Sequence, residues 1–436
     1  MTDPLERATI RKVGARLLPI LFILYIAAYL DRTNVGLAAL QMNAAVGMSA
    51  AAYGFGAGVF FIGYGLFEVP SNLLLARVGA RRWIARIAIT WGIIACATMF
   101  VQGATSFYVL RFLLGAAEAG AFPGIVYYLG EWFPNRNRAR ALSQFMVSVP
   151  LAGAIGGPVG GVLLSLDSRL GLGGWQWLFL IEGIPSIVLG LIVLFVLVDR
   201  PTEATWLSNE ERAWLIRRLD DERSTREQVA ETSVMRAMTS GIVWWFSLLY
   251  FLALAAYLGT IFFGPVLLSD TLHVSSLTVG YIMGAIGLAG VVGMLLNGAN
   301  SDRTNERIVH SAAPMFSMAV GFAITARASG PVLLVLGLAL ISFSLNAFLP
   351  VFWCVPATVL SGPAAAGGIA LINSIGNLGG FVAPNIVGYG KTISGNYSGS
   401  MWILGGFAAI AGMMTLALRT ASARPAAAAS ASVDRY

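Results

Sequence analysis

Six ionisable residues lie inside long apolar segments of the sequence, where charge is costly. They are Asp31, Arg32, Glu68, Arg111, Glu118 and Glu182. An unpaired charge at the middle of a bilayer costs at least roughly 2.5–3.5 kcal/mol on insertion scales, so such residues are functional by default. We interpret Asp31 and Glu118 as acids that take up protons. Arg32 and Arg111 can bind a carboxylate, because the planar guanidinium fork bonds both oxygens.

Residue spacing predicts that these groups share one depth. At 1.5 Å per residue, Asp31 lies roughly 20 Å into its segment and Glu118 roughly 16 Å into its own, from the opposite side. Asp31 and Arg32 are adjacent, so their side chains diverge by about 100° and pair poorly with each other. Protonation of both acids leaves a charge of +2, which attracts an anion. A purely structural ion pair, or a bracing role for Arg111, is the alternative. We place Glu68 and Glu182 nearer the cytoplasmic ends, in gating or packing roles.

The second half of the sequence carries neutral polar and aromatic groups in its apolar segments. They are Tyr250, Tyr257, Asn346, Trp353, Asn373 and Asn377. Asn373 and Asn377 are four residues apart and share a helical face. We expect this half to contact the body of a substrate, with Tyr29 and Tyr64 of the first half beside the charged layer. Packing is the alternative for all of these side chains.

The elements that position these residues are membrane-spanning helices. The 436 residues are 57% apolar and 11% charged, against roughly 25% charged in soluble domains. Apolar runs of the roughly 20 residues that cross a bilayer occur twelve times. The predicted spans are 17–41, 53–76, 82–104, 107–131, 141–166, 175–199, 241–268, 278–299, 310–328, 331–358, 366–391 and 400–418. This composition predicts an all-α membrane protein.

The spans fall into two six-helix halves, 17–199 and 241–418, between an N-terminal segment 1–16 and a disordered tail 419–436. The central loop 200–240 holds a short helix, since Ser208 and Glu211 have capping-box spacing. Arginines cluster in the loops on one side, which places both termini and the central loop in the cytoplasm. The net charge of +7 therefore reflects these loops and does not indicate nucleic-acid binding. Similar basic loops follow the second and eighth spans, as expected for duplicated halves.

Four separated motifs resemble those of the major facilitator superfamily, and within it the anion:cation symporter family. They are YLDRTNVG at 29–36, RFLLGAAEAGAFPG at 111–124, NSIGNLGG at 373–380 and WLSNEERAWL at 206–215. The resemblance covers about residues 11–419. It implies two pseudo-symmetric six-helix bundles, alternating access, and proton-coupled uptake of a small organic anion such as tartrate, hydroxyphenylacetate or phthalate.

The resemblance also implies roles for individual residues. Asp31 and Glu118 would carry protons, and Arg32 and Arg111 would hold the carboxylate. The superfamily's gating loops correspond to Arg77 and Arg81 in the first half and to Asp302 and Arg303 in the second. Two departures matter. Ala76 stands where the pattern has an acid before the arginine. Pro150 stands where permeases for sugar acids have a glutamine, which disfavours a polyhydroxylated substrate.

Two other functions compete with uptake. The glycine-rich segment GAIGGPVGG at 153–161 is similar to a motif of drug exporters, so proton-driven export is the alternative within transport. A membrane enzyme or sensor needs catalytic residues or a large soluble domain, and the sequence offers neither. We expect a monomer in a bacterial inner membrane that uses protons and a carboxylate anion, with no cofactor, metal ion or nucleic acid.

Overall fold

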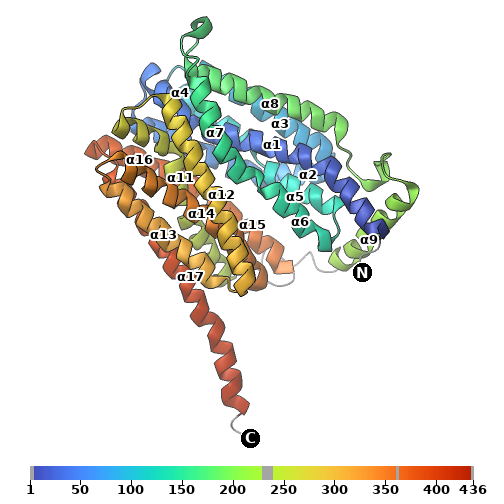
Figure 1. Cartoon of the computed structure of the whole chain (residues 1–436). Coiled ribbons are helices and arrows are strands. Elements are labelled where there is room, and N and C mark those ends of the chain that lie inside the picture. Colours follow the sequence, from blue (N-terminus) through green and yellow to red (C-terminus); the bar gives the residue numbers. More distant parts are fainter. Residues whose placement is uncertain (1–3, 228–238, 360–362, 434–436) are drawn as a thin grey trace. The chain divides into compact units, whose positions relative to one another are not determined.

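The described part of the chain is helical in the computed structural model, which covers residues 4–227, 239–359 and 363–433 (Figure 1). No strand occurs in these ranges. The chain divides into two compact units, which are described separately. The first comprises residues 1–230 and 275–281, and the second comprises residues 231–274 and 282–436.

The first unit contains nine α-helices and three short 3₁₀ helices within its described residues. They are α1 (Pro4–Ala45), α2 (Ala50–Val78), α3 (Ala80–Ala97), η1 (Thr98–Phe100), α4 (Ala104–Glu118), α5 (Ala121–Trp132), α6 (Asn135–Met146), α7 (Ser148–Leu164), η2 (Arg169–Gly171), α8 (Gly174–Val196), η3 (Pro201–Glu203) and α9 (Asn209–Glu227). Helix α1 packs against α7 and α8, α3 packs against α8, and α2 packs against α4.

The second unit is built in the same way from long apolar helices. They are α11 (Gly241–Leu272), α12 (Ser276–Thr304), α13 (Ile308–Arg327), α14 (Pro331–Val359), α15 (Pro363–Asn377), α16 (Gly379–Ser394) and α17 (Ser398–Val433). Helix α13 packs against α14 and α17, and α11 packs against α15, α16 and α17. The first residues of α12 belong to the first unit by their contacts.

The prediction of an all-α protein with twelve spans is confirmed. Twelve stretches of the described chain are long and apolar enough to cross a membrane. Each corresponds to one predicted span, and most boundaries agree within a few residues. Helices suit this environment because they satisfy every backbone N–H and C=O within the segment.

Three spans are each divided between two helices, which the sequence analysis did not predict. The fourth span is α4 followed by α5, and the break falls at Ala119 and Gly120, directly after Glu118. Gly120 has a φ of 87°, in the left-handed region that glycine adopts without strain. Single residues that keep helical backbone angles, Val147 and Leu378, separate α6 from α7 and α15 from α16. Glu118 and Asn377 are thus the last residues of their helices.

Glycines bring α2 and α4 into close contact. A Cβ added to Gly115 would lie 2.0 Å from the carbonyl oxygen of Phe60, and one added to Gly63 would lie 2.3 Å from that of Phe112. Small residues permit such close approach between membrane helices. The contact fixes the residues of α4 against those of α2 and so positions the site described below.

The short helix of the central loop is confirmed as α9, together with its capping box. The backbone N–H of Ser208 donates to Glu211 at 2.9 Å, and the N–H of Glu211 donates to Ser208 Oγ at 3.2 Å. Leu215 and Leu219 are buried, and α9 contacts α1 and α5 (Figure 1). Its apolar edge therefore packs on protein.

Candidate functional site

The centre of the first unit is an ion pair between Arg32 on α1 and Glu118 at the end of α4. The Glu118 side chain is 1% exposed, and that of Arg32 is 15% exposed. Asp31 and Glu118 each stand 14 residues from the same side of the bundle, counted from Ala45 and Ala104, which is about 21 Å of helix. The helix bounds therefore place Asp31 and Glu118 at the common depth that the residue spacing predicts.

Two aromatic rings of α2 line the arginine side of this pair. The guanidinium carbon of Arg32 lies 5.4 Å from the centroid of Phe60 and 5.3 Å from that of Tyr64. The guanidinium carbon of Arg111 lies 4.8 Å from the centroid of Phe60. Cation–π attraction of this kind stabilises desolvated cations. Tyr64 was predicted to lie beside the charged layer, whereas Phe60 was missed because phenylalanine carries no polar signal.

Arg111 is buried without a counter-ion in its immediate neighbourhood. Its side chain is among the largest that are fully buried. Its Nε and Nη2 atoms have no hydrogen-bond acceptor, and it forms no salt bridge within the described residues. Tyr53 and Glu118 lie within electrostatic range. A buried charge without a paired partner is destabilising.

Asp31 is held by residues that the sequence analysis did not single out. Trp91 of α3 donates its Nε1–H to Asp31 Oδ2 at 3.0 Å, and Ser186 of α8 donates its hydroxyl to the same oxygen at 2.6 Å. Asp31 is 2% exposed, and its Oδ1 atom has no hydrogen bond. As expected from the spacing, Asp31 does not pair with Arg32. Its partners are neutral.

Tyr25 is a further residue of this site that was missed. It is buried on α1, lies within electrostatic range of Arg32, Glu118 and Glu68, and packs on Phe145 with ring centroids 4.8 Å apart. Tyr25, Tyr29 and Arg32 follow one another at spacings of four and three residues, which is one helical face. That periodicity was the available signal. Tyr29 itself is half-buried.

In the second unit, Tyr257 belongs to a polar cluster. It interacts with Ser342 and Asn346 of α14, and Asn346 donates to the carbonyl of Ser342 at 2.9 Å. A Cβ on Gly290 of α12 would lie 2.6 Å from the amide nitrogen of Asn346. The cluster therefore occupies the contact between α11, α12 and α14.

Trp353 and the paired asparagines lie on either side of Tyr250. The ring centroids of Tyr250 and Trp353 are 5.0 Å apart, and a Cβ on Gly376 would lie 2.1 Å from the ring of Tyr250. Gly376 stands between Asn373 and Asn377, and Asn377 Nδ2 donates to the backbone carbonyl of Asn373 at 3.0 Å. Both asparagines are half-buried.

The predicted gating residues lie at loop ends, with partners that the sequence did not reveal. In the first unit, Arg77 is exposed, and the backbone N–H of Arg81 donates to Asp199 Oδ1 at 2.7 Å. Asp199 thus supplies an acid to the loop that has Ala76 in place of one. In the second unit, Asp302 pairs with Arg307 at 2.6 Å. Arg303 is exposed and forms no ion pair with the described residues.

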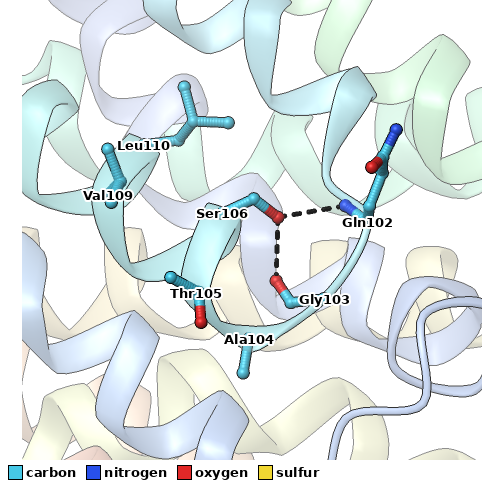
Figure 2. Close-up of a pocket in the computed structure, with 7 residues that line it drawn as sticks. All are labelled: Gln102, Gly103, Ala104, Thr105, Ser106, Val109 and Leu110. Atoms are coloured by element: carbon cyan, nitrogen blue, oxygen red, sulfur yellow. Dashed lines mark hydrogen bonds between the residues drawn. The ribbon is translucent and has the colours of Figure 1, made fainter.

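A surface pocket at the start of α4 contains none of the predicted site residues. Residues 102–106, Val109 and Leu110 line it. Figure 2 shows the hydroxyl of Ser106 accepting from the N–H of Gln102 and donating to the carbonyl of Gly103, at 3.0 Å each. These bonds join the loop before α4 to the first turn of the helix. No ionisable side chain lines the pocket, so the charged cluster remains the candidate site.

Comparisons with known proteins agree with this architecture. The model of the Major Facilitator Superfamily matches residues 21–384. A protein of Agrobacterium vitis named "Putative tartrate transporter" is 44% identical over 97% of this chain and 94% of its own length. The "Quinolone resistance transporter" of Acinetobacter baumannii is 40% identical over 92% of each chain. The "Putative metabolite transport protein NicT" of Pseudomonas putida is 42% identical over 94% of each.

Solved structures share the fold at low sequence identity. A bacterial homologue of the human lysosomal transporter Spinster has a TM-score of 0.76 at 17% identity, covering 96% of this chain and 98% of its own. A D-xylose–proton symporter has a TM-score of 0.72 at 15% identity, covering 92% and 96%. The relatives are transporters and not enzymes, as the sequence analysis predicted. With the twelve spans and the superfamily match together, this chain belongs to the major facilitator superfamily and is a membrane transporter.

Proposed function

We propose that the protein takes up a small carboxylate anion together with protons. The observation that carries the proposal is the buried Arg32–Glu118 pair beside Arg111, which has no counter-ion among the described residues. A proton on Glu118 cancels the charge that holds Arg32. Both guanidinium groups then face an incoming carboxylate, to which each can donate two parallel hydrogen bonds.

The exchange of partners explains why anion and proton move together. An ionised Glu118 competes with the carboxylate for Arg32, and a protonated Glu118 does not. An ionised Glu118 therefore leaves only Arg111 for the carboxylate, and its protonation makes Arg32 available as well. Asp31 is the second proposed proton carrier. Its neutral partners, Trp91 and Ser186, allow it to change charge without breaking an ion pair.

The second unit offers neutral groups for the body of the substrate. Tyr257, Trp353, Asn373 and Asn377 are the proposed contacts, since hydroxyl and amide groups can bond substrate hydroxyls and aromatic rings exclude water. Two relatives bear the name of a tartrate transporter, which makes tartrate the first substrate to test. We place the carrier as a monomer in a bacterial inner membrane, with both termini in the cytoplasm, on the arginine bias of its loops.

Uptake by reconstituted protein tests the proposal directly. Proteoliposomes with an acidic outside and a neutral inside should accumulate labelled tartrate, and the accumulation should vanish when a protonophore collapses the gradient. Accumulation that is indifferent to the pH gradient contradicts proton coupling. A panel of aliphatic and aromatic acids, scored by thermal stabilisation of the purified carrier, then identifies the preferred anion.

Export is the second candidate, and one relative favours it. The 40% identical protein of Acinetobacter baumannii is named a quinolone resistance transporter, and the glycine-rich segment 153–161 resembles an exporter motif. The same vesicles discriminate the two functions. When the proton gradient is directed inward, an exporter driven by protons expels preloaded substrate from the vesicles. A symporter concentrates substrate inside them under the same gradient.

A further inference from the structure

Buried polar atoms without hydrogen bonds gather where α1 meets α8. They are Asp31 Oδ1, both side-chain atoms of Asn34 and both carboxyl oxygens of Glu182. The three residues are 2%, 3% and 6% exposed, respectively. Polar atoms buried in this way carry a desolvation cost that is normally offset by partners. The sequence analysis assigned Glu182 a gating or packing role and did not single out Asn34 as a functional residue.

The position of Glu182 differs from the expectation. It stands 8 residues after the start of α8 at Gly174 and 14 before its end at Val196, so it lies in the half of α8 nearer the loop that follows α7. The prediction that it lies towards the opposite, cytoplasmic end was wrong. The error arose because that assignment did not count residues along a span that runs back across the membrane.

Two layers of contacts relate Glu182 to Asp31. Ser186 on α8 donates to Asp31 on α1 at 2.6 Å. One turn along α1 is Asn34, and one turn back along α8 is Glu182, which has Asn34 as its polar neighbour. Glu182 also lies within electrostatic range of Asp31. The second layer therefore stacks directly on the first.

Among the described residues, the groups that interact with Glu182 include no cation. From α1 it meets Asp31 and Asn34. From α3, Cys96 packs against the neighbouring Gly183, where an added Cβ would lie 2.7 Å from its sulfur. Helix α7 contains no titratable residue between its bounds. In the described part of the chain, the polar neighbours of the two carboxyl groups are thus Trp91, Ser186 and Asn34, and Glu118 lies within electrostatic range of Asp31.

Charge counting over the described buried groups shows what this arrangement needs. Asp31, Glu68, Glu118 and Glu182 face Arg32 and Arg111, which leaves a charge of −2 when all are ionised. Two neighbouring carboxyls in a site of low dielectric do not ionise together, and their protons leave in coupled steps. Arg32 is paired with Glu118, which leaves Asp31, Glu68 and Glu182 with Arg111 as the remaining buried charges.

We propose that Glu182 is a third proton-carrying residue, coupled to Asp31 and positioned by Asn34. The inference rests on the proposed proton symport. Its consequence is a higher ratio of protons to substrate than Asp31 and Glu118 alone provide. Glu182→Gln keeps the shape of the side chain, and the Glu182 oxygens make no hydrogen bond that the change would remove.

The test measures the accumulation ratio of labelled tartrate at equilibrium, with the membrane potential held at zero by valinomycin and equal potassium on both sides. Each coupled proton multiplies this ratio about tenfold per pH unit of gradient. Glu182→Gln should therefore reach a ratio about tenfold below wild type at a gradient of one unit. Glu182→Asp, which keeps an acid, should reach the wild-type ratio.

The outcomes separate this inference from the proposed function. If wild-type protein shows no accumulation driven by pH, the symport proposal fails. If wild type accumulates and Glu182→Gln reaches the same ratio, only the role of Glu182 fails. A folded Glu182→Gln protein that cannot exchange tartrate at equal pH also overturns it, because Glu182 would then serve binding.

Asn34→Ala provides a second approach if the Glu182 variants do not fold. It leaves the acid in place and removes the amide that can stabilise its ionised form. The pH dependence of tartrate uptake should move towards alkaline pH relative to wild type. An unchanged profile overturns the inference.

Discussion

Arg32 on α1 forms an ion pair with Glu118, the last residue of α4 before the helix is interrupted at Gly120. The acid thus stands at a helix end, where backbone geometry can change without disturbing a continuous run of hydrogen bonds. Transporters often form their substrate and ion sites at discontinuous helices of this kind. The partner of Arg32 therefore stands directly before the interruption of the fourth span.

Glu118→Gln should weaken the coupling of transport to the pH gradient. The amide cannot take up a proton, and it leaves Arg32 without its ionic partner, so tartrate binds at any pH. Equilibrium exchange of labelled tartrate across the vesicle membrane should persist, whereas the accumulation ratio should fall about tenfold per pH unit of gradient, because one coupled proton is lost. If the variant concentrates tartrate as well as wild type, Glu118 is not a proton carrier.

Arg111→Met should separate binding from stability. The change removes a buried charge without a paired partner, so the substrate-free protein should melt no lower than wild type, with each ~1 kcal/mol gained raising Tm by about 2–4 °C. Stabilisation by added tartrate should disappear. Arg138→Met is the control, because Arg138 donates to the carbonyl of Gly130 at 2.8 Å and its loss should lower Tm. A lower Tm for Arg111→Met would indicate a bracing role.

Arg32→Lys should weaken tartrate binding severely although the charge is kept. An ammonium group is a point donor and cannot reproduce the two parallel bonds of a guanidinium to a carboxylate. Titration of the purified variant with tartrate, followed by thermal shift, should show a loss of apparent affinity of at least about tenfold, or roughly 1.4 kcal/mol. Unchanged affinity argues against Arg32 as the carboxylate ligand.

Gly115→Ala should destabilise the first unit by about 1–3 kcal/mol. The new methyl group would meet the carbonyl oxygen of Phe60 at 2.0 Å, so α2 and α4 must separate and carry Phe60 away from Arg111. Gly153→Ala is the matched control, since nothing lies within 4 Å of an added Cβ there. Thermal melting of both variants checks the expectation. Equal stability of the two would show that α2 and α4 adjust without cost.

The docking of α9 should depend on acid pH through Glu211. Its hydrogen bond with Lys12, at 2.7 Å, together with the N–H of Ser208, lowers the pKa of the Glu211 carboxyl below its ordinary value of 4.5. A lowered pKa in the folded state gives stability that is present above pH 4.5 and is lost as the pH falls through the lower value. Lys12 is half exposed, so the contribution is at most about 1 kcal/mol.

Comparison of wild type with Lys12→Met tests this contribution. The variant should melt below wild type at pH 7, and the difference should shrink at acid pH, because a protonated Glu211 no longer attracts the lysine. A difference of the same size at both pH values would mean that Lys12 acts by packing.

Hydropathy predicted the twelve spans because the requirement for about 20 apolar residues is local. The depth of Asp31 and Glu118 followed from counting residues. The partners of Asp31 could not be predicted from the sequence. Trp91 and Ser186 belong to α3 and α8, and their distance from Asp31 depends on how those helices rotate and pack. Tyr25 could have been found from its helical spacing to Tyr29 and Arg32.

The break after Glu118 had a weaker signal. Gly120 and Pro123 stand close together, and glycine near proline commonly marks an interruption of a helix. Glycine and proline also occur inside uninterrupted spans of this chain, so their presence alone did not predict the break. Asp199 shows a different limit. Its contact with Arg81 joins residues 118 positions apart, and no local pattern encodes that distance.

Phe60 lies against the guanidinium groups of both Arg32 and Arg111. A ring engaged by two cations tunes how strongly the pair attracts negative charge, and it does so whatever the rest of the anion looks like. Replacing Phe60 with leucine should therefore weaken the binding of aliphatic acids and of aromatic acids by the same factor. The ring affects the affinity for the negative charge of the anion, and other side chains determine which anion is selected.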